Sequence, residues 1–265
     1  MKWGERMDIW KELQDEGIDA ALLEEIRHFR EAHPVPPEAA ARIPVPQCLY
    51  YGKEVWESAA AALLCGQHLL LAGPKATGKN VLAENLAAVF GRPVWDVSMY
   101  VNVDAAALIG ADTLQKGEVV FREGPICRCA RLGGFGVLDE VNMAKNEALV
   151  SRFVVLDMPV ISDADLQKLL RRTFPDLTPR WAEQFALLFH DLRQKCDSGE
   201  ISTKTLDLRG LLAALRLIRE GIPTGQALKL GIINKAFEPF ERQLAADTVW
   251  ARIPQDAGRS QLFGV

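Results

Sequence analysis

The spacing of apolar residues divides the chain into a mixed first half and a helical second half. Between residues 68 and 157, short apolar runs alternate with helical patterns, as in folds that place helices over a parallel sheet. From Ser162 onward, apolar residues recur at helical spacing, with Pro175, Gly199 and Pro223 as interruptions. The expected strands span residues 69–72, 93–97, 135–138 and 154–157, and the expected later helices span 163–174, 179–196, 206–221 and 224–246.

The residues before the first strand also follow a helical pattern. Apolar and charged residues alternate at near-helical spacing over 1–33, and Gly17 is expected to divide this stretch into two helices. Prolines in 34–37 and 44–46 stop the pattern, and an amphipathic helix over 53–64 leads to the first strand. We expect residues 1–37 to form a helical segment that packs on the rest of the chain.

The stretch His68–Asn80, HLLLAGPKATGKN, combines an apolar strand, a glycine-bounded loop, a lysine and the start of a helix. This is the layout of a phosphate-binding P-loop. Glycines let backbone N–H groups converge on phosphate oxygens, and the helix N-terminus adds partial positive charge. Lys79 supplies a mobile full charge for the outer phosphates. The residues expected to contact a nucleotide are Gly73, Pro74, Lys75, Ala76, Thr77, Gly78, Lys79 and Asn80.

Asn80 departs from the usual P-loop pattern, which ends in Ser or Thr with a hydroxyl that binds Mg²⁺. An amide oxygen can also bind a hard cation, so Asn80 is kept as a metal ligand. The alternative is an ordinary strand-to-helix turn with a surface lysine, and the matching strand and helix on either side favour the phosphate site.

Two further patterns follow the P-loop. Residues 111–124 have a hairpin signature with Lys116-Gly117 at the turn, and a helix is expected over 126–132. Residues 135–140 form an apolar run that ends in Asp139 and Glu140, which is a Walker B pattern. A buried strand would carry these acids to the edge of a parallel sheet where ligands bind. Asp139 would hold Mg²⁺, and Glu140 would position or deprotonate the attacking water.

Composition restricts the class of protein further. The chain has 265 residues, of which 49% are hydrophobic and 25% charged, so it is long enough for one large or two smaller domains. A net charge of −4 gives no signal for nucleic-acid binding. Five scattered cysteines favour a reducing compartment, and Cys127 and Cys129 have the wrong spacing for a zinc knuckle. The first residues lack a signal-peptide core and no stretch is long enough to span a membrane, so we expect a cytoplasmic protein.

Several segments together resemble the MoxR group of AAA+ ATPases over most of the chain. The resemblance implies ATP and Mg²⁺ as cofactors and a homo-oligomeric ring, usually hexameric, that acts as a chaperone on a client protein. It also implies a partner with a von Willebrand A-type domain. The segments that carry it are GPKATGKN (73–80), VVFREGPI (119–126), GVLDEVNMAKNEAL (136–149), SRFVVLDMP (151–159) and LDLRGLLAAL (206–215).

The same resemblance assigns two arginines. Arg152 is implied to be an arginine finger that reaches the γ-phosphate in a neighbouring subunit, and Arg209 to be sensor 2, which contacts the phosphates from the helical lid. A guanidinium group suits both roles because it is always charged and its planar fork matches phosphate oxygens.

One departure from the family concerns the stretch between the Walker B acids and the finger. In this fold a strand with a polar sensor 1 residue lies there, but only residues 141–152 separate Glu140 from Phe153. In the family, the tetrapeptide at 146–149 would fit both the segment that follows Walker B and the segment that leads up to the finger. This suggests an in-frame deletion between two similar sequences. We therefore expect a four-stranded remnant of the sheet, and ATP binding with little turnover.

The sequence predicts an α/β P-loop NTPase, an αβα sandwich with a parallel sheet of AAA+ type, followed by an all-helical lid. The expected boundaries are a P-loop domain over 38–160, a lid over 161–250 and a tail over 251–265. The expected function is ATP hydrolysis coupled to remodelling of a partner protein. One alternative is a nucleotide-binding scaffold subunit with little hydrolysis. Another is the GTP-using motor of a restriction system, which no base-reading motif or basic patch supports.

Overall fold

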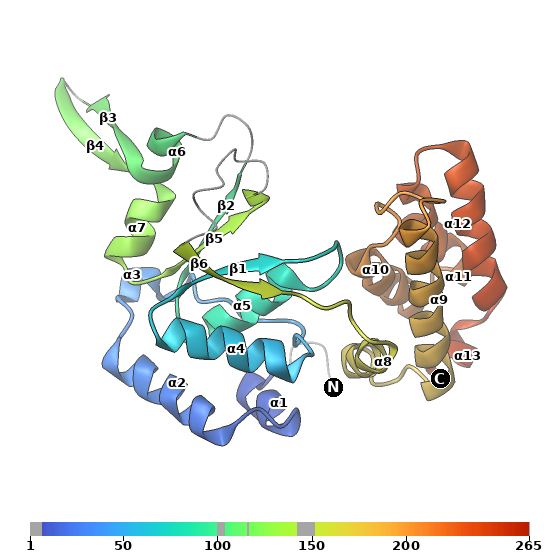
Figure 1. Cartoon of the computed structure of the whole chain (residues 1–265). Helices are drawn as coiled ribbons and strands as arrows, with labels where there is room; N and C mark the ends of the chain where they lie inside the picture. Colours follow the sequence, from blue (N-terminus) through green and yellow to red (C-terminus); the bar gives the residue numbers. More distant parts are fainter. Residues whose placement is uncertain (1–6, 100–103, 116, 142–151, 265) are drawn as a thin grey trace. The chain divides into compact units, whose positions relative to one another are not determined.

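The computed structural model describes residues 7–99, 104–115, 117–141 and 152–264 (Figure 1). The described residues form two compact units. The first unit contains 7–72 and 79–157, and the second contains 158–264 together with the loop 73–78. An α/β unit with parallel strands and a helical unit after it are present, which confirms the expected fold class.

The first unit begins with helices that match the apolar pattern. Gly17, with a φ of +72°, divides the first stretch into α1 and α2 as expected. Asp8 and Asp19 begin these two helices, because each side chain accepts hydrogen bonds from backbone N–H groups of the first turn. The helices are α1 (Ile9–Asp15), α2 (Ala20–Ala32), α3 (Pro37–Ala40) and α4 (Lys53–Leu64).

The helix after the P-loop, α5 (Lys79–Val89), lies against α2 and β5. The ring of Phe90 lies 5.3 Å from that of Phe29 and 5.8 Å from that of Phe135. The Arg30 guanidinium donates to the Val89 carbonyl at 3.1 Å. These contacts hold the end of α5 between the first helices and the strand that carries the Walker B acids.

Four parallel strands are present, but they form two separate pairs. β1 (His68–Ala72) pairs with β6 (Phe153–Asp157), and β2 (Val94–Ser98) pairs with β5 (Phe135–Asp139). Among the described residues no ladder joins β1 to β5. The expected single four-stranded sheet is therefore wrong. Residues 142–151, which separate β5 from β6 in the sequence, lie outside the described residues.

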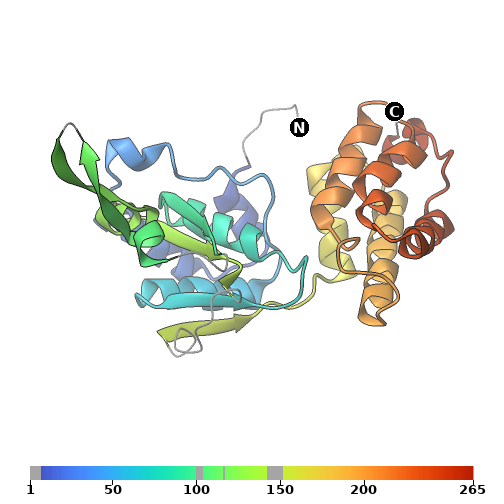
Figure 2. The same cartoon turned by 90° about the horizontal axis from the view of Figure 1, so that it is seen from above.

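The expected hairpin is confirmed and points away from the parallel strands in two views (Figures 1 and 2). It consists of β3 (Gly110–Gln115) and β4 (Glu118–Glu123), which pair antiparallel between α6 (Ala105–Ile109) and α7 (Pro125–Arg131). In the turn, Gly117 has a φ of +88°, while Lys116 lies outside the described residues. At the base of α7, Ala39, Trp95, Cys129 and Leu132 form a small buried cluster.

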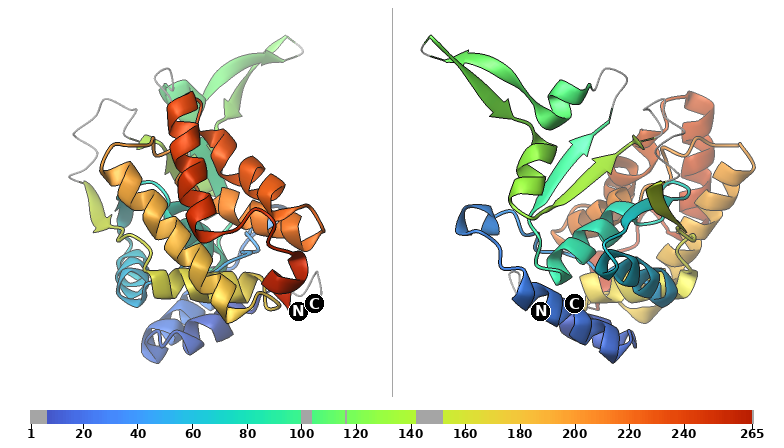
Figure 3. Two further views of the ribbon diagram at one scale, coloured as in Figure 1. Left: turned by 90° about the vertical axis from the view of Figure 1, so that its right-hand side faces the viewer. Right: turned by 60° about the vertical axis from the view of Figure 1, so that its left-hand side comes forward.

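The second unit is helical, and Figure 3 shows α9 and α12 side by side. The single helix expected over 224–246 is wrong, since α11 ends at Gly231 and α12 begins at Pro239. Proline fits the first helical position but cannot continue a preceding helix. The helices are α8 (Asp163–Thr173), α9 (Pro179–Asp197), α10 (Leu208–Arg219), α11 (Thr224–Gly231), η3 (Ile233–Lys235), α12 (Pro239–Arg252) and α13 (Arg259–Phe263).

Residues 251–264 are the part of the expected tail that the structure describes. They contain α13, in which Leu262 and Phe263 are buried. The Phe263 ring lies 6.2 Å from that of Phe174, and the Leu262 carbonyl accepts a hydrogen bond from the Thr178 backbone at 2.9 Å. These contacts anchor the end of the chain on α8 and the start of α9.

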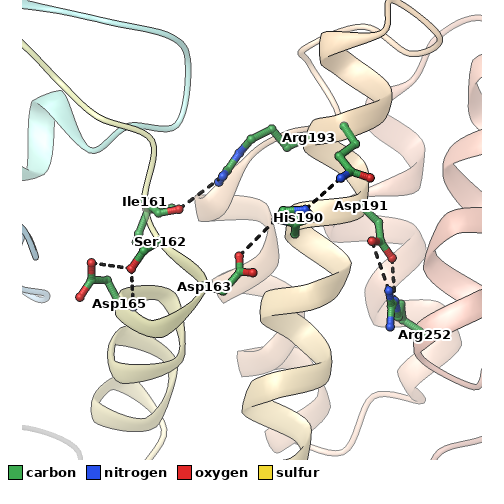
Figure 4. A network of polar contacts seen from close by, with 9 residues as sticks. Ile161, Ser162, Asp163, Asp165, His190, Asp191, Arg193 and Arg252 are labelled. Atoms are coloured by element: carbon green, nitrogen blue, oxygen red, sulfur yellow. Dashed lines mark hydrogen bonds and ion pairs between the residues drawn. The ribbon is translucent and has the colours of Figure 1, made fainter.

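A network of polar contacts ties the start of the helical unit to α9 (Figure 4). The Arg193 guanidinium donates to the Ile161 carbonyl at 3.3 Å, and His190 lies 3.5 Å from Asp163. On the same helix, Asp191 accepts from Arg252 of α12 at 2.6 Å. None of the helices in the described part of the chain has the length and apolarity needed to cross a membrane.

Candidate functional site

The loop between β1 and α5 has the backbone conformation expected of a phosphate cradle. Ala76 and Gly78 have φ angles of +62° and +82°, whereas Lys75 before Ala76 and Thr77 between Ala76 and Gly78 have negative φ. Such alternation turns successive N–H groups toward one side and forms an anion-binding concavity. A left-handed conformation costs a residue with a Cβ about 1–2 kcal/mol, so the backbone at Ala76 is strained.

Further contacts hold this loop in shape. The Thr77 side chain is buried, and its hydroxyl donates to the Pro74 carbonyl at 3.1 Å. Gly73 has a φ of +140°, and a Cβ on it would lie 2.8 Å from the Met158 carbonyl oxygen. Only glycine fits there without moving the backbone. The loop then enters α5 at Lys79, where the helix N-terminus adds to its attraction for anions.

The Walker B acids follow β5, and one of them contacts the first turn of α5. The Asn80 amide nitrogen lies 3.2 Å from a carboxylate oxygen of Asp139. The other oxygen of Asp139 accepts from the Glu140 backbone N–H at 2.9 Å. Glu140 itself has a φ of +58°. The structure therefore brings the expected metal ligands Asn80 and Asp139 together, and it places Glu140 in a strained conformation beside them.

The residues at this contact suit a hard divalent cation. Asp139 and Asn80 carry a carboxylate and an amide oxygen, both of which are ligands that Mg²⁺ accepts. Both side chains are exposed, so a hydrated ion that keeps several water ligands has access to them. On this chemistry the donor set fits Mg²⁺.

The two implied arginines lie outside this cluster of contacts. Arg152 is exposed and directly precedes β6. Arg209 is exposed in the first turn of α10, where its backbone N–H donates to the capping Asp207 side chain at 3.0 Å. Both side chains are accessible, and their roles stay predictions. The tetrapeptide at 146–149 lies outside the described residues.

The sequence interpretation missed Asn85, a fully buried polar residue on α5. Its side-chain oxygen accepts from the Tyr50 backbone N–H at 2.7 Å, and its nitrogen donates to the Cys48 carbonyl at 3.0 Å. Asn85 therefore fixes the segment that leads into α4 against the P-loop helix. The available signal was a polar residue on the apolar face of α5, between Leu82 and Leu86.

Comparison with known proteins gives relatives without an established function. The chain is 25% identical over 283 positions to the uncharacterized protein YojN of Bacillus subtilis, which covers 87% of this chain and 92% of YojN. It is 26% identical over 250 positions to the uncharacterized protein SH1500 of Staphylococcus haemolyticus, which covers 74% of this chain and 95% of SH1500. The alignment with YojN is longer than the 265 residues of this chain, so within the aligned region YojN has residues that this chain lacks.

The family comparison covers both motifs of the site. Residues 68–207 match the AAA domain of the dynein-related subfamily. This match runs from β1 through the P-loop and the Walker B acids to Asp207, the cap of α10. The chain therefore belongs to the AAA domain family, in its dynein-related subfamily.

Proposed function

We propose that this chain binds ATP with Mg²⁺ and is the ATPase subunit of a MoxR-like ring that remodels a partner protein. The observation that supports it best is the contact between Asn80 of the P-loop helix and Asp139 of β5. This contact links the first turn of the helix that follows the P-loop in the sequence to the strand that carries the Walker B acids. The family to which the chain belongs supports nucleotide binding independently.

Each residue has a role in this proposal that follows from its chemistry. The loop amides and Lys79 bind the phosphates, while Asp139 and Asn80 hold the metal ion. Bound Mg²⁺ would neutralise charge on the phosphates. Glu140 orients the attacking water and accepts its proton, and Arg152 of a neighbouring subunit stabilises the charge that develops. Arg209 contacts the phosphates from the helical unit.

The chaperone role, the hexamer and the von Willebrand A-type partner rest on the resemblance of several sequence segments to the MoxR group. Ring formation is usual for AAA+ proteins and is consistent with an arginine finger at Arg152 that acts between subunits. Mixing Arg152→Ala with Glu140→Gln subunits should restore some hydrolysis, because mixed interfaces would combine an intact finger with an intact base. Mixtures that never exceed either variant would remove the finger from the proposal, provided the parent protein is active.

A second candidate is a subunit that binds ATP but turns it over slowly. The split between the two strand pairs favours it, since Lys79 follows β1 and Glu140 follows β5. Without a common ladder, the distance between these two groups is not fixed by the sheet. A misplacement of about 1 Å can reduce a rate roughly 100-fold. Steady-state phosphate release distinguishes the two candidates, and competition by GTP tests the nucleotide preference.

The binding site itself is tested by removing its lysine. Lys79→Ala retains the loop amides but loses the mobile cation, so ATP affinity in calorimetry should fall at least about tenfold. The matched control is Lys53→Ala, which makes the same charge change on α4, where Lys53 lies 3.7 Å from Glu57. Equal affinity of Lys79→Ala and Lys53→Ala would remove the P-loop from the proposal.

A further inference from the structure

Helices α10 and α11 of the helical unit contact each other through two glycine backbones. A Cβ on Gly210 would overlap the Gly231 carbonyl oxygen, and a Cβ on Gly231 would overlap the Gly210 carbonyl oxygen. Neither glycine has a positive φ, so glycine is required at both positions by close packing alone. Gly210 directly follows Arg209, and the contact therefore fixes the backbone that carries the Arg209 side chain.

An ion pair connects the same two parts of the helical unit. Lys235 belongs to η3, which follows α11, and Asp207 is the cap of α10. The Lys235 ammonium donates to one carboxylate oxygen of Asp207, while the other oxygen accepts from the Arg209 backbone N–H at 3.0 Å. The Lys235 and Asp207 side chains are 32% and 34% exposed, so the pair is partly shielded from solvent. One carboxylate thus joins η3 to the turn of α10 that carries Arg209.

The surroundings of Arg209 favour contact with Asp207 unless that carboxylate is neutralised. Arg209 is exposed in the first turn of α10, where the positive end of the helix dipole repels a cation. An arginine side chain is long enough to fold back onto a carboxylate two residues earlier, and such charge-assisted hydrogen bonds are strong. Lys235 already supplies Asp207 with a positive charge. The Arg209 guanidinium is therefore available to phosphate oxygens instead.

We propose that Lys235 is a positioning residue for Arg209, which it keeps available for the phosphates of a bound nucleotide by neutralising Asp207. The inference rests on the proposed function, in which Arg209 contacts these phosphates from the helical unit. Lys235 lies beyond residues 68–207, the part of the chain that matches the AAA domain, so the family match does not assign it a role. Because Lys235 acts through Arg209, its removal should matter only while Arg209 is present.

The experiment measures ATP affinity by calorimetry in four versions of the full chain, which are the parent, Arg209→Ala, Lys235→Met and the variant with both changes. Arg209→Ala should weaken ATP binding about tenfold, because it removes a cation from the phosphates. Lys235→Met, which retains an unbranched apolar stem, should weaken binding about fivefold in the parent but less than about 1.5-fold in Arg209→Ala. The matched control is Lys229→Met in the last turn of α11, which should leave ATP affinity unchanged.

A second pair of variants separates the effect of charge from an effect on folding. Lys235→Arg retains the charge and should keep ATP affinity within about twofold of the parent, whereas Lys235→Gln should show the same loss as Lys235→Met. A change in packing alone would lower the urea midpoint of unfolding without this dependence on charge.

The outcomes distinguish the inference from the proposed function. If Arg209→Ala leaves ATP affinity unchanged, the proposed role of Arg209 is wrong and the inference is overturned with it. If Arg209→Ala weakens binding but Lys235→Met does not, only the inference is overturned. Equal losses from Lys235→Met with and without Arg209, or no recovery of affinity in Lys235→Arg, would also overturn it.

Discussion

The helical unit and the parallel strands differ in how completely their apolar side chains are buried. In the helical unit, α9 alone buries six residues, and Phe185 and Leu188 have no exposed surface. In the strands, only Trp95 is buried, and Val155 of β6 is 44% exposed. Both regions have the apolar sequence of a core. The difference shows that the helical unit contains the partners for its apolar faces, whereas each parallel strand pairs with a single neighbour among the described residues.

This difference leads to different expectations for nucleotide binding and for ATP hydrolysis. A P-loop needs a short loop and a helix start, and both are present with their local contacts. Hydrolysis needs groups on different strands at fixed distances, and the sheet that would set those distances is split. The account therefore predicts stable packing in the helical unit, intact nucleotide binding and impaired hydrolysis.

The largest expected effect on stability is in the helical core. Phe185→Ala removes a ring with no exposed surface, so unfolding free energy should fall by about 3–5 kcal/mol. Urea denaturation followed by the helical signal measures it. A loss of less than about 1 kcal/mol would mean that this core is as loosely packed as the strands.

A smaller effect is expected at the buried amide of α5. Asn85→Ala removes the side-chain hydrogen bonds to the Tyr50 N–H and the Cys48 carbonyl, which should destabilise the first unit by about 2 kcal/mol or more. Hydrogen exchange over 48–64 should increase in parallel. Asn80→Ala, an exposed asparagine on the same helix, is the control and should leave exchange there unchanged. If Asn85→Ala does no more than the control, Asn85 does not anchor this segment.

The contact between Asn80 of α5 and Asp139 of β5 can be tested through the Mg²⁺ dependence of ATP binding. Asn80→Thr introduces the hydroxyl that usually binds Mg²⁺ at this position, so Mg²⁺-dependent ATP affinity should be unchanged or up to about tenfold higher. Calorimetry with and without Mg²⁺ measures this. If Asn80→Thr loses the Mg²⁺ dependence, Asn80 has a different role from metal binding.

The smallest effect on stability is expected for a substitution in the parallel strands. Val155→Ala on β6 removes methyl groups from a side chain that is 44% exposed, so unfolding free energy should change by less than about 1 kcal/mol. Urea denaturation measures this change, and a large cost would mean that the strands pack as well as the helical core.

Local sequence patterns predicted the elements more reliably than their pairing. Helix α4 was expected over 53–64 and has those bounds, because its apolar period is regular and Gly52 and Gly66 flank it. The break between α11 and α12 was missed, although Pro239 marks it. The split of the strands into two pairs depends on which chain segments meet in space, and no local pattern encodes that directly.

In the candidate site, too, the sequence predicted some features and missed others. The loop residues follow from a motif with known spacing, and the structure shows the Asn80 amide 3.2 Å from the Asp139 carboxylate, while the roles of these residues stay predictions. Asn85 was missed because its role depends on the backbone of a segment far away in the sequence. The positive φ of Glu140 was also not predicted, because no local pattern in the sequence marks a left-handed conformation at a glutamate.

The most direct measurement compares ATP turnover per subunit, at saturating MgATP, between this chain and a version with a strand segment restored between Glu140 and Arg152. Binding is measured in the same samples by calorimetry. The account predicts that both proteins bind ATP with similar affinity and that the restored version hydrolyses it at least about 100-fold faster. Equal turnover in the two proteins would contradict the account and would make the short chain a complete ATPase.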